Sequence, residues 1–442
     1  MEEYITRGQN LKVLRKKLGL KQYEITGGEI TRNLISLIEH DKTPLHEGVA
    51  RLISENINKI SDERNMDIVV FPEDLMNPVR LKAKSLADEY ISKLKIYLED
   101  PEKEIDKKLL EDMEFFLQNW NLPDKKSKAY EMLGDIYEKR NDFEKMYIYL
   151  TKALENYFLK PYNKDINKLI LKLSFACMHT KRYEESINLT NLALSYEDTV
   201  EKYGSKVYYN RSVIFNRMKN YDKALVDLEK CRVLLTSKNK LDEDEKVRLK
   251  RLIIVEGNCY KNKKEYLKAI EVYQKMYNMT EEIQSVGEKC AATMNIAETY
   301  EIMDNKEKVR EYILKSEELL DEIAEDSFYK TRIYQDLAER YKYLKDEEKT
   351  KHYYERALNN FDPKKEKEGI NNLLLDFINF YRETNSTEDI STLISNIEEM
   401  VEHINVDLNI RLLLNYLLFN IENNRVVDSM NIINKLLNKG EN

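Results

Sequence analysis

Apolar residues recur along the first sixty positions at the spacing of short amphipathic helices. In "ITRNLISLIEHDKTP", residues 30–44, the residues Ile30, Leu34, Ile35 and Ile38 fall on one side of a predicted helix. The opposite edge of that helix is polar and carries Arg32, Asn33 and Ser36. The pattern therefore predicts a helix that buries one side and presents a small polar edge to solvent.

Three further short helices are predicted around this segment. "GQNLKVLRKKLGLKQYEI" predicts a basic amphipathic helix, a turn at Gly19 and a second short helix beginning near Gln22. Pro44 closes a turn after the polar-edged helix, and "EGVARLISENINKI" then supplies a packing helix. We expect residues 1–66 to form one small helical domain.

The chain changes character after this domain. "MDIVVFPEDLMNPV" contains Pro72 and Pro78, which disfavour a continuous helix, so residues 67–80 are predicted to be a linker. Helical patterns then follow one another over residues 81–442, and only 11 Gly and 7 Pro occur in 442 residues. This sparse punctuation favours long helices, and the predicted fold class is all-α.

The second region repeats. Tyr130, Leu133, Gly134 and Tyr137 fit the W-x-x-L-G-x-x-Y core of the tetratricopeptide repeat, which they resemble. Units are predicted to start near residues 127, 167, 205, 250, 290, 331, 371 and 411, at intervals of 40, 38, 45, 40, 41, 40 and 40. Residues 80–120 predict one more helical pair without the motif. The resemblance implies a right-handed α-solenoid of about eight or nine repeats with a concave inner surface.

Two positions in each unit are expected to form the packing between paired helices. The eleventh place holds mostly large rings: Tyr137, Cys177, Phe215, Tyr260, Tyr300, Tyr341, Tyr381 and Ile421. The twentieth place, where a small residue suits a close helix crossing, holds Ser186, Ala224, Ala269 and Thr350, but also Met146, Val309, Ile390 and Met430. Core packing accounts for these residues without a binding role.

The N-terminal domain resembles a helix-turn-helix of the Xre/lambda-repressor type over roughly residues 7–60. The resemblance rests on Leu11, Leu14, Arg15, the Leu20-x-Gln22 start and "IxRNLISLIEHDKTP", in which Ile35, Ile38 and Glu39 match the core of the family. One departure is "EITGG", which replaces the usual end of the second helix. The match implies that Arg32, Asn33 and Ser36 face base edges.

Phosphate contacts are expected around this reading edge. Arg7, Lys12, Arg15, Lys16, Lys17 and Lys21 occur with no acidic residue between Tyr4 and Tyr23, although the whole chain has a net charge of −8. Nucleic-acid contact should therefore be local to this domain. The candidate phosphate ligands are Lys16, Lys17, Lys21, Gln22, Lys42 and Thr43.

The two regions together resemble the RRNPP group of peptide-pheromone-responsive regulators of Gram-positive bacteria. That resemblance implies a cytoplasmic, homodimeric quorum-sensing transcription factor that binds a double-stranded DNA operator and a short linear signalling peptide. Side-chain amides can donate to and accept from an extended peptide backbone. The candidate peptide-binding residues on the first helices of the units are Tyr209, Asn210, Arg251, Asn258, Asn295, Gln335, Asn379 and Arg382.

Other functional classes find less support. The five histidines are scattered, no phosphate-cradling glycine loop appears, and Cys177, Cys231, Cys259 and Cys290 lack metal-ligand spacing, so neither enzyme activity nor a cofactor or metal is expected. The N-terminus lacks the build of a signal peptide, and no apolar run is long enough to span a bilayer.

Three alternatives stay open. The repeats could form a protein-interaction scaffold, or a phosphatase-like regulator that binds response regulators, with the DNA module secondary. The chain could also be a phage lysis-lysogeny peptide sensor that uses the same chemistry.

Overall fold

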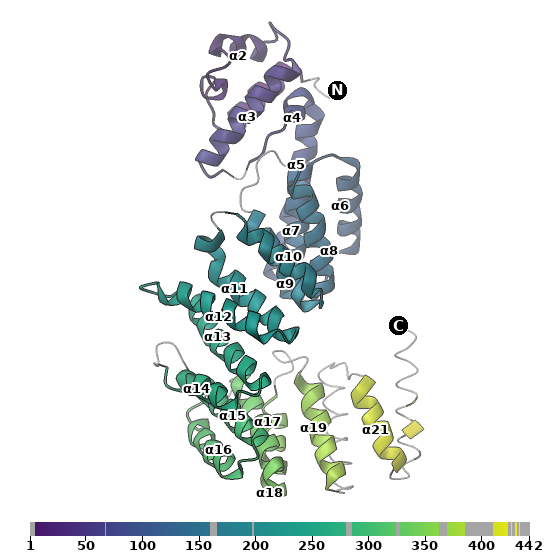
Figure 1. Ribbon diagram of the computed structural model, residues 1–442. Helices are drawn as coiled ribbons and strands as arrows, with labels where there is room; N and C mark the ends of the chain where they lie inside the picture. The colour runs from purple at the N-terminus through teal and green to yellow at the C-terminus, as the bar shows by residue number, and fades with distance from the viewer. Residues whose placement is uncertain are drawn as a thin grey trace. The chain divides into compact units, whose positions relative to one another are not determined.

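The computed structural model describes residues 5–66, 68–159, 166–196, 199–279, 285–323, 328–361, 369–384 and 410–422, with Val426, Ser429, Met430 and Ile433. All regular structure in these ranges is helical, as the fold class predicts (Figure 1). The chain divides into two compact units, Met1–Ile214 and Phe215–Asn442.

The first unit begins with a small helical domain. It contains α1 (Arg7–Lys17), the 3₁₀ turn η1 (Glu24–Thr26), α2 (Arg32–Glu39), α3 (Glu47–Glu63) and α4 (Pro72–Met76). Thr6 and Gln9 form a capping box at the start of α1, and the Thr31 hydroxyl caps α2 by accepting from the N–H of Leu34. The core side chains are Leu11, Leu14, Leu20, Ile25, Ile35, Ile38, Leu45, Ala50, Ile53, Ile57, Val70 and Leu75.

The second helix expected near Gln22 is wrong in extent, because only the single 3₁₀ turn η1 forms there. Gly27 and Gly28 adopt φ values of 59° and 81°, in the left-handed region that favours glycine. A right-handed helix cannot continue through such residues, so η1 ends at Thr26. The segment 68–80, expected to join the two regions, contains α4 and the start of the next helix. Its Val70 and Leu75 complete the core of the N-terminal domain.

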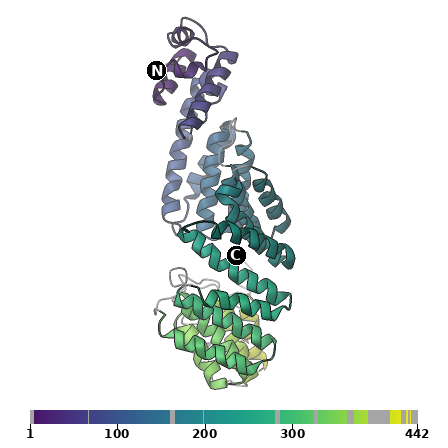
Figure 2. The same cartoon turned by 60° about the vertical axis from the view of Figure 1, so that its left-hand side comes forward.

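Long helices follow in pairs. The first unit continues with α5 (Pro78–Glu99), α6 (Lys107–Asn119), α7 (Pro123–Lys139), α8 (Phe143–Tyr157), α9 (Ile166–His179), α10 (Tyr183–Leu194) and most of α11 (Thr199–Arg217). The second unit contains α12 (Tyr221–Thr236), α13 (Glu243–Asn262), α14 (Tyr266–Tyr277), α15 (Val286–Ile302), α16 (Lys306–Leu320), α17 (Phe328–Leu344), α18 (Glu347–Asn359), α19 (Gly369–Glu383) and α21 (Ile410–Glu422). Each predicted repeat start falls in the first half of a helix, and α5 with α6 forms the additional pair (Figures 1 and 2).

The turns inside the six pairs from α7–α8 to α17–α18 each contain a helix-ending residue in the left-handed region. Asn141, Lys181, Lys219, Lys264, Asp304 and Lys345 all have φ between 53° and 65°, although none is glycine. These positions recur at 40, 38, 45, 40 and 41 residues, which are the intervals predicted for the repeat. The backbone thus repeats with the same phase as the side-chain pattern.

Side chains at the predicted packing places behave largely as expected. At the eleventh place Tyr137, Cys177, Tyr341 and Tyr381 are buried, Phe215, Tyr260 and Tyr300 are partly buried, and Ile421 is exposed. At the twentieth place Met146, Ser186, Ala224, Ala269, Val309 and Thr350 are all fully buried, Met430 is exposed, and Ile390 lies outside the described residues. The larger residues are therefore accommodated within the packed pairs.

A lysine lies over the eleventh-place ring in four of the units. The ammonium stands 4.6–5.6 Å from the ring centroid in the pairs Lys145–Tyr137, Lys223–Phe215, Lys268–Tyr260 and Lys349–Tyr341. In each pair the lysine comes eight residues after the ring, at the start of the second helix. This cation–π contact is a second repeated feature of the array.

Candidate nucleic-acid interface and peptide site

The predicted reading edge lies on the exposed side of α2. Arg32 and Asn33 occupy the first turn of the helix and are exposed, and Ser36 follows one turn later and is partly exposed. Ile35 and Ile38, on the other side, are buried in the core of the domain. Residues three and four apart share a face of a helix, so the structure brings the three predicted base-reading residues together.

Glu39, at the end of α2, organises the domain from inside. Its carboxylate accepts from Arg15 Nε (2.5 Å) and Nη2 (2.8 Å) and from Gln22 Nε2 (2.8 Å), while Arg15 Nη1 donates to the Leu20 carbonyl (2.7 Å). Burial opposes ionisation of Glu39, but the bonds from Arg15 and Gln22 outweigh it and hold the pKa of the carboxyl below its usual range.

The bonds that Arg15 and Gln22 make to Glu39 change what was expected of both residues as phosphate contacts. Arg15 is 9% exposed and paired with Glu39, so its inclusion in a phosphate-facing basic surface is wrong. Gln22 remains a candidate phosphate ligand, but one N–H of its amide is already committed to Glu39 and only the second can donate outward.

The other candidate phosphate ligands lie at the surface. Lys16, Lys17, Lys21 and Lys42 are exposed, and Thr43 is partly exposed. Within the described ranges, none of the four lysines has an ion-pair partner within 4 Å. By contrast, Lys152, Lys172, Lys261 and Lys342 of the repeats each form an ion pair with a glutamate of another helix. Lys21 stands 5.8 Å from the ring centroid of the exposed Tyr23.

A buried charged hub joins the N-terminal domain to the helices behind it. Asp74 accepts from the Phe71 N–H (2.8 Å), from Arg80 Nε (2.6 Å) and from Lys84. Lys84 also pairs with Asp124 of α7 (3.1 Å). From α1, Asn10 donates to the carbonyls of Asp74 (2.8 Å) and Leu75 (3.0 Å). The hub therefore fixes α4 and α5 against α1 on one side and against α7 on the other.

The candidate peptide-binding residues of the first unit lie on α11. Asn210 is 7% exposed, and its Nδ2 has no hydrogen-bond partner in the part of the chain that the structure describes. Tyr209, beside it, is partly buried, and its carbonyl accepts from the Ser212 hydroxyl (2.6 Å). A buried amide donor without a partner costs about 1–3 kcal/mol, and Asn210 is the one candidate peptide-binding residue among the several described residues with such an atom.

The candidates of the second unit divide into two groups. Gln335 and Arg382 already connect successive repeats. Gln335 Nε2 donates to Asp376 (2.9 Å), and Arg382 pairs with Glu422 (3.0 Å). Asn258 accepts from the Tyr273 hydroxyl (2.7 Å), while Asn295 and Asn379 are partly buried and Arg251 is exposed. The bonds of Gln335 and Arg382 must break before either residue can hold a peptide.

Similar bonds tie successive first helices together elsewhere. Pairs one repeat apart include Lys172 with Glu131 and Asp135, Lys250 with Glu288, Lys261 with Glu298, Arg340 with Glu301, and Lys342 with Glu383. Burial raises the pKa of the Asp135 and Glu301 carboxyls despite their partners. The signal that could have revealed these bonds is the recurrence of opposite charges about 40 residues apart.

Asp336 on α17 is a carboxyl whose pKa differs from its ordinary value of 3.8. Burial raises its pKa to about 6, Arg332 and Arg340 act against this shift, and Glu298 and Glu339 add to it. The four cysteines are buried free thiols whose pKa burial raises, to about 12 for Cys177, Cys231 and Cys259 and about 11 for Cys290.

Within the described ranges, neither a metal-ligand cluster nor a membrane-spanning helix occurs. No group of three or more His, Cys, Asp or Glu side chains is arranged to hold a metal ion. None of the described helices combines the length and the apolar character that crossing a bilayer requires.

Comparison with known proteins identifies the repeats. The tetratricopeptide repeat family matches residues 127–157 and 205–231, and no curated protein matches the sequence. Among solved structures, apo RapI is 13% identical, with a TM-score of 0.44 over 80% of this chain and 99% of RapI. PlcR of Bacillus thuringiensis, solved with the peptide PapR7 and DNA, is 14% identical, with a TM-score of 0.34 over 61% of this chain and 92% of PlcR.

A third solved structure, MamA from Desulfovibrio magneticus RS-1, is 16% identical, with a TM-score of 0.34 over 44% of this chain and 94% of MamA. These likenesses describe the arrangement of helices alone. The two matched segments coincide with α7–α8 and α11–α12, which are pairs of the predicted repeat. The described residues are all-α, and two of their helical pairs match the tetratricopeptide repeat family.

Proposed function

We propose that this protein is a peptide-responsive transcriptional regulator of the RRNPP type. The N-terminal domain binds duplex DNA, and the repeat array binds a short linear peptide that changes this binding. The observation that carries the proposal is the exposed edge of α2, where Arg32, Asn33 and Ser36 project from a helix whose other side is buried.

The chemistry of this edge suits base recognition. Arginine can donate two parallel hydrogen bonds to guanine, and asparagine can pair with adenine, each worth about 1–3 kcal/mol of discrimination. Serine can donate to or accept from either type of base pair. Thr31 fixes the start of the helix, so the first-turn side chains are held in place before DNA arrives.

The surface lysines supply the sequence-independent part of the affinity. Lys16, Lys17, Lys21 and Lys42 are exposed, and no carboxylate of the described residues pairs with them. Each phosphate that such a cation neutralises releases counterions and strengthens binding. Gln22 and Thr43 would add neutral hydrogen bonds that set the register.

Asn210 supports the peptide-binding half of the proposal. Its buried Nδ2 lacks an acceptor, and an extended peptide offers backbone carbonyls that would satisfy it. Asn258, Asn295 and Asn379 recur on the first helices of later repeats, in the second compact unit, and are candidates for the same kind of contact. Tyr209, Arg251, Gln335 and Arg382 complete the proposed set.

The proposed switch requires that the peptide prefer one arrangement of the array over another. A differential affinity of about 1–3 kcal/mol would change DNA affinity 5–150-fold. We place the protein in the cytoplasm as a homodimer, whose two α2 helices would read half-sites about 34 Å apart, or a multiple of that distance.

Footprinting on the DNA upstream of the gene, with and without synthetic peptides encoded by short neighbouring reading frames, tests the proposal. Arg32→Ala with Asn33→Ala should relax sequence preference by about 1–3 kcal/mol per lost contact, whereas Arg51→Ala, at an exposed arginine of α3, should not. Asn210→Ala should weaken the peptide response and leave DNA binding intact. A chain that binds no duplex under any condition would instead be a protein-interaction scaffold.

A further inference from the structure

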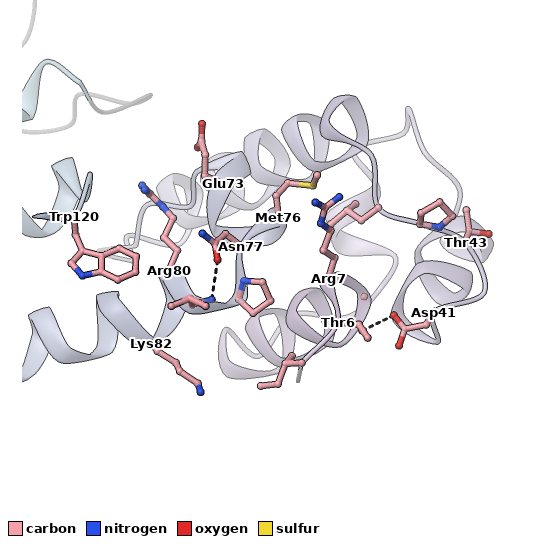
Figure 3. Close-up of a pocket in the computed structure, with 16 residues that line it drawn as sticks. Thr6, Arg7, Asp41, Thr43, Glu73, Met76, Asn77, Arg80, Lys82 and Trp120 are labelled. Carbon is pink, nitrogen blue, oxygen red and sulfur yellow. Dashed lines mark hydrogen bonds between the residues drawn. The ribbon is translucent and has the colours of Figure 1, made fainter. Parts of the chain in front are cut away.

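A groove of about 1220 Å³ runs along the N-terminal domain where it meets the helices of the array (Figure 3). One side is formed by the start of α1, including Arg7, and by the loop after α2, including Thr43. The other side is formed by α4 and the first turns of α5, including Lys82. The groove thus connects a candidate phosphate ligand, Thr43, with a helix outside the predicted DNA-binding domain.

Two cations of this groove lack acidic partners. Arg7 and Lys82 are exposed, and no carboxylate in the described ranges lies within ion-pair distance of either. Arg80, which also lines the groove, is instead buried and bonded to Asp74. Arg7 and Lys82 are therefore the two positive charges that the groove can offer to a ligand.

The acidic residues of the groove lie apart from Lys82. Glu73 and Lys82 extend to opposite sides of α4 and α5, and the Asp41 carboxylate accepts a hydrogen bond from the Thr6 hydroxyl (2.6 Å) (Figure 3). The positive charge of Lys82 is consequently not cancelled by a neighbouring carboxylate. A phosphate that approaches on the Lys82 side meets an exposed ammonium.

The hub described above holds the two sides of the groove together. Asn10 ties α1 to α4, and Asp74 ties α4 to Arg80 and Lys84 of α5. Lys84 lies two residues after Lys82 on the same helix. Because these contacts are buried, the backbone of α5 that carries Lys82 is fixed relative to α1.

We propose that Arg7 and Lys82 contact DNA phosphates beside the sequence that α2 reads. The DNA interface then continues from the N-terminal domain onto α5, the first helix of the array. The inference rests on the proposed function and extends it, since Lys82 lies outside the predicted helix-turn-helix. A duplex backbone matches the site because it presents a row of negative charges to exposed cations.

The test measures the affinity of the full chain for a random-sequence duplex over a series of salt concentrations. Such binding is mainly electrostatic, so no operator needs to be known. Lys82→Ala and Arg7→Ala should each make the slope of log K against log salt shallower by about 0.9, and the double variant by about twice that amount. Lys95→Ala, at an exposed lysine farther along α5, is the matched control and should leave the slope unchanged.

The outcomes separate this inference from the proposed function. If the wild-type chain binds duplex and Lys82→Ala has the slope of Lys95→Ala, the extended interface is refuted while DNA binding stands. If Lys82→Ala makes the slope on random duplex shallower by about 0.9 and Lys95→Ala does not, as loss of a phosphate contact requires, the inference is supported. If the wild-type chain binds no duplex, the proposed function itself fails.

Discussion

Arg15 and Glu39 form a two-pronged ion pair between α1 and the end of α2, with Nε–Oε1 and Nη2–Oε2 distances of 2.5 and 2.8 Å. The side chain of Glu39 is 1% exposed and that of Arg15 is 11% exposed, so the pair is nearly dry. It holds the helix that carries Arg32 and Asn33 against the helix that precedes it. The reading edge therefore depends on an internal bond as well as on the apolar core.

Removing one member of this pair should destabilise the N-terminal domain. Arg15→Met leaves Glu39 buried with only Gln22 as a side-chain partner, and breaking a buried pair costs about 3–5 kcal/mol. Hydrogen exchange of the α1 and α2 amides would measure the loss locally. The double variant Arg15→Met, Glu39→Met should recover much of it, because no charge is then left unpaired. Equal amide protection in wild type and Arg15→Met would show that the Arg15–Glu39 pair does not stabilise the domain.

The same pair predicts an acid sensitivity. Since the folded state holds the pKa of Glu39 below its ordinary value of 4.5, the carboxylate contributes stability that is fully present above pH 4.5. That contribution is lost as the pH falls through the lowered folded value. Exchange of the α2 amides should accelerate with acid in the wild type, and Glu39→Gln should flatten this dependence. Parallel profiles for the two proteins would refute the linkage.

The hub offers two carboxylates with unequal roles. Asp74→Asn should cost about 3–5 kcal/mol, because Asp74 accepts from a backbone N–H and two buried cations. Asp124→Asn should cost only about 1 kcal/mol, since Asp124 bonds Lys84 through Oδ2 alone and its Oδ1 has no hydrogen-bond partner in the described part of the chain. Chemical denaturation of both variants checks the order, and a larger loss from Asp124→Asn would reverse the assignment.

Gly8 predicts a steric effect at the junction of α1 and α2. A Cβ at this position would lie 1.9 Å from the Ile38 carbonyl oxygen, so Gly8→Ala must push the two helices apart. Overpacking of this kind costs about 1–3 kcal/mol. Gly48→Ala, in the first turn of α3 with no atom within 4 Å of the added carbon, should be neutral or slightly stabilising. Thermal unfolding and duplex binding of the two variants should diverge, and similar behaviour would argue against the close approach.

Asp336 predicts a pH dependence within the second unit. Because burial raises its pKa from 3.8 to about 6, the folded state favours the protonated carboxyl, and stability should fall as the pH rises from about 4 through 6. Asp336→Asn should remove this loss and be the more stable protein at pH 7. Melting temperatures between pH 4.5 and 8 provide the measurement, with Asp112→Asn at an exposed position of α6 as control. A constant difference across that range would disprove the assignment.

Local pattern predicted the fold closely and the candidate site only in part. Apolar spacing located α2 and its exposed edge, because that pattern depends on residues within one or two turns of each other. The recurrence of the tetratricopeptide pattern every 38–45 residues located the helical pairs from α7 onward, whereas α5 and α6 were predicted from helical spacing alone. The short η1 was missed because Gln22 begins like a helix, while the left-handed Gly27 and Gly28 stop it. The partners of Arg15, Gln335 and Arg382 lie 24 to 41 residues away, beyond the reach of periodicity within one helix.

The left-handed residue between the helices of each pair has an evolutionary consequence. Since each of the six pairs from α7–α8 to α17–α18 ends its own first helix, from Asn141 through Lys345, a stretch of about forty residues carries its own turn and depends on its neighbours only for packing. In-frame duplication or deletion of such a stretch would lengthen or shorten the array without disturbing the turns on either side. Genes for related chains could thus change in size by whole units, at little cost to folding.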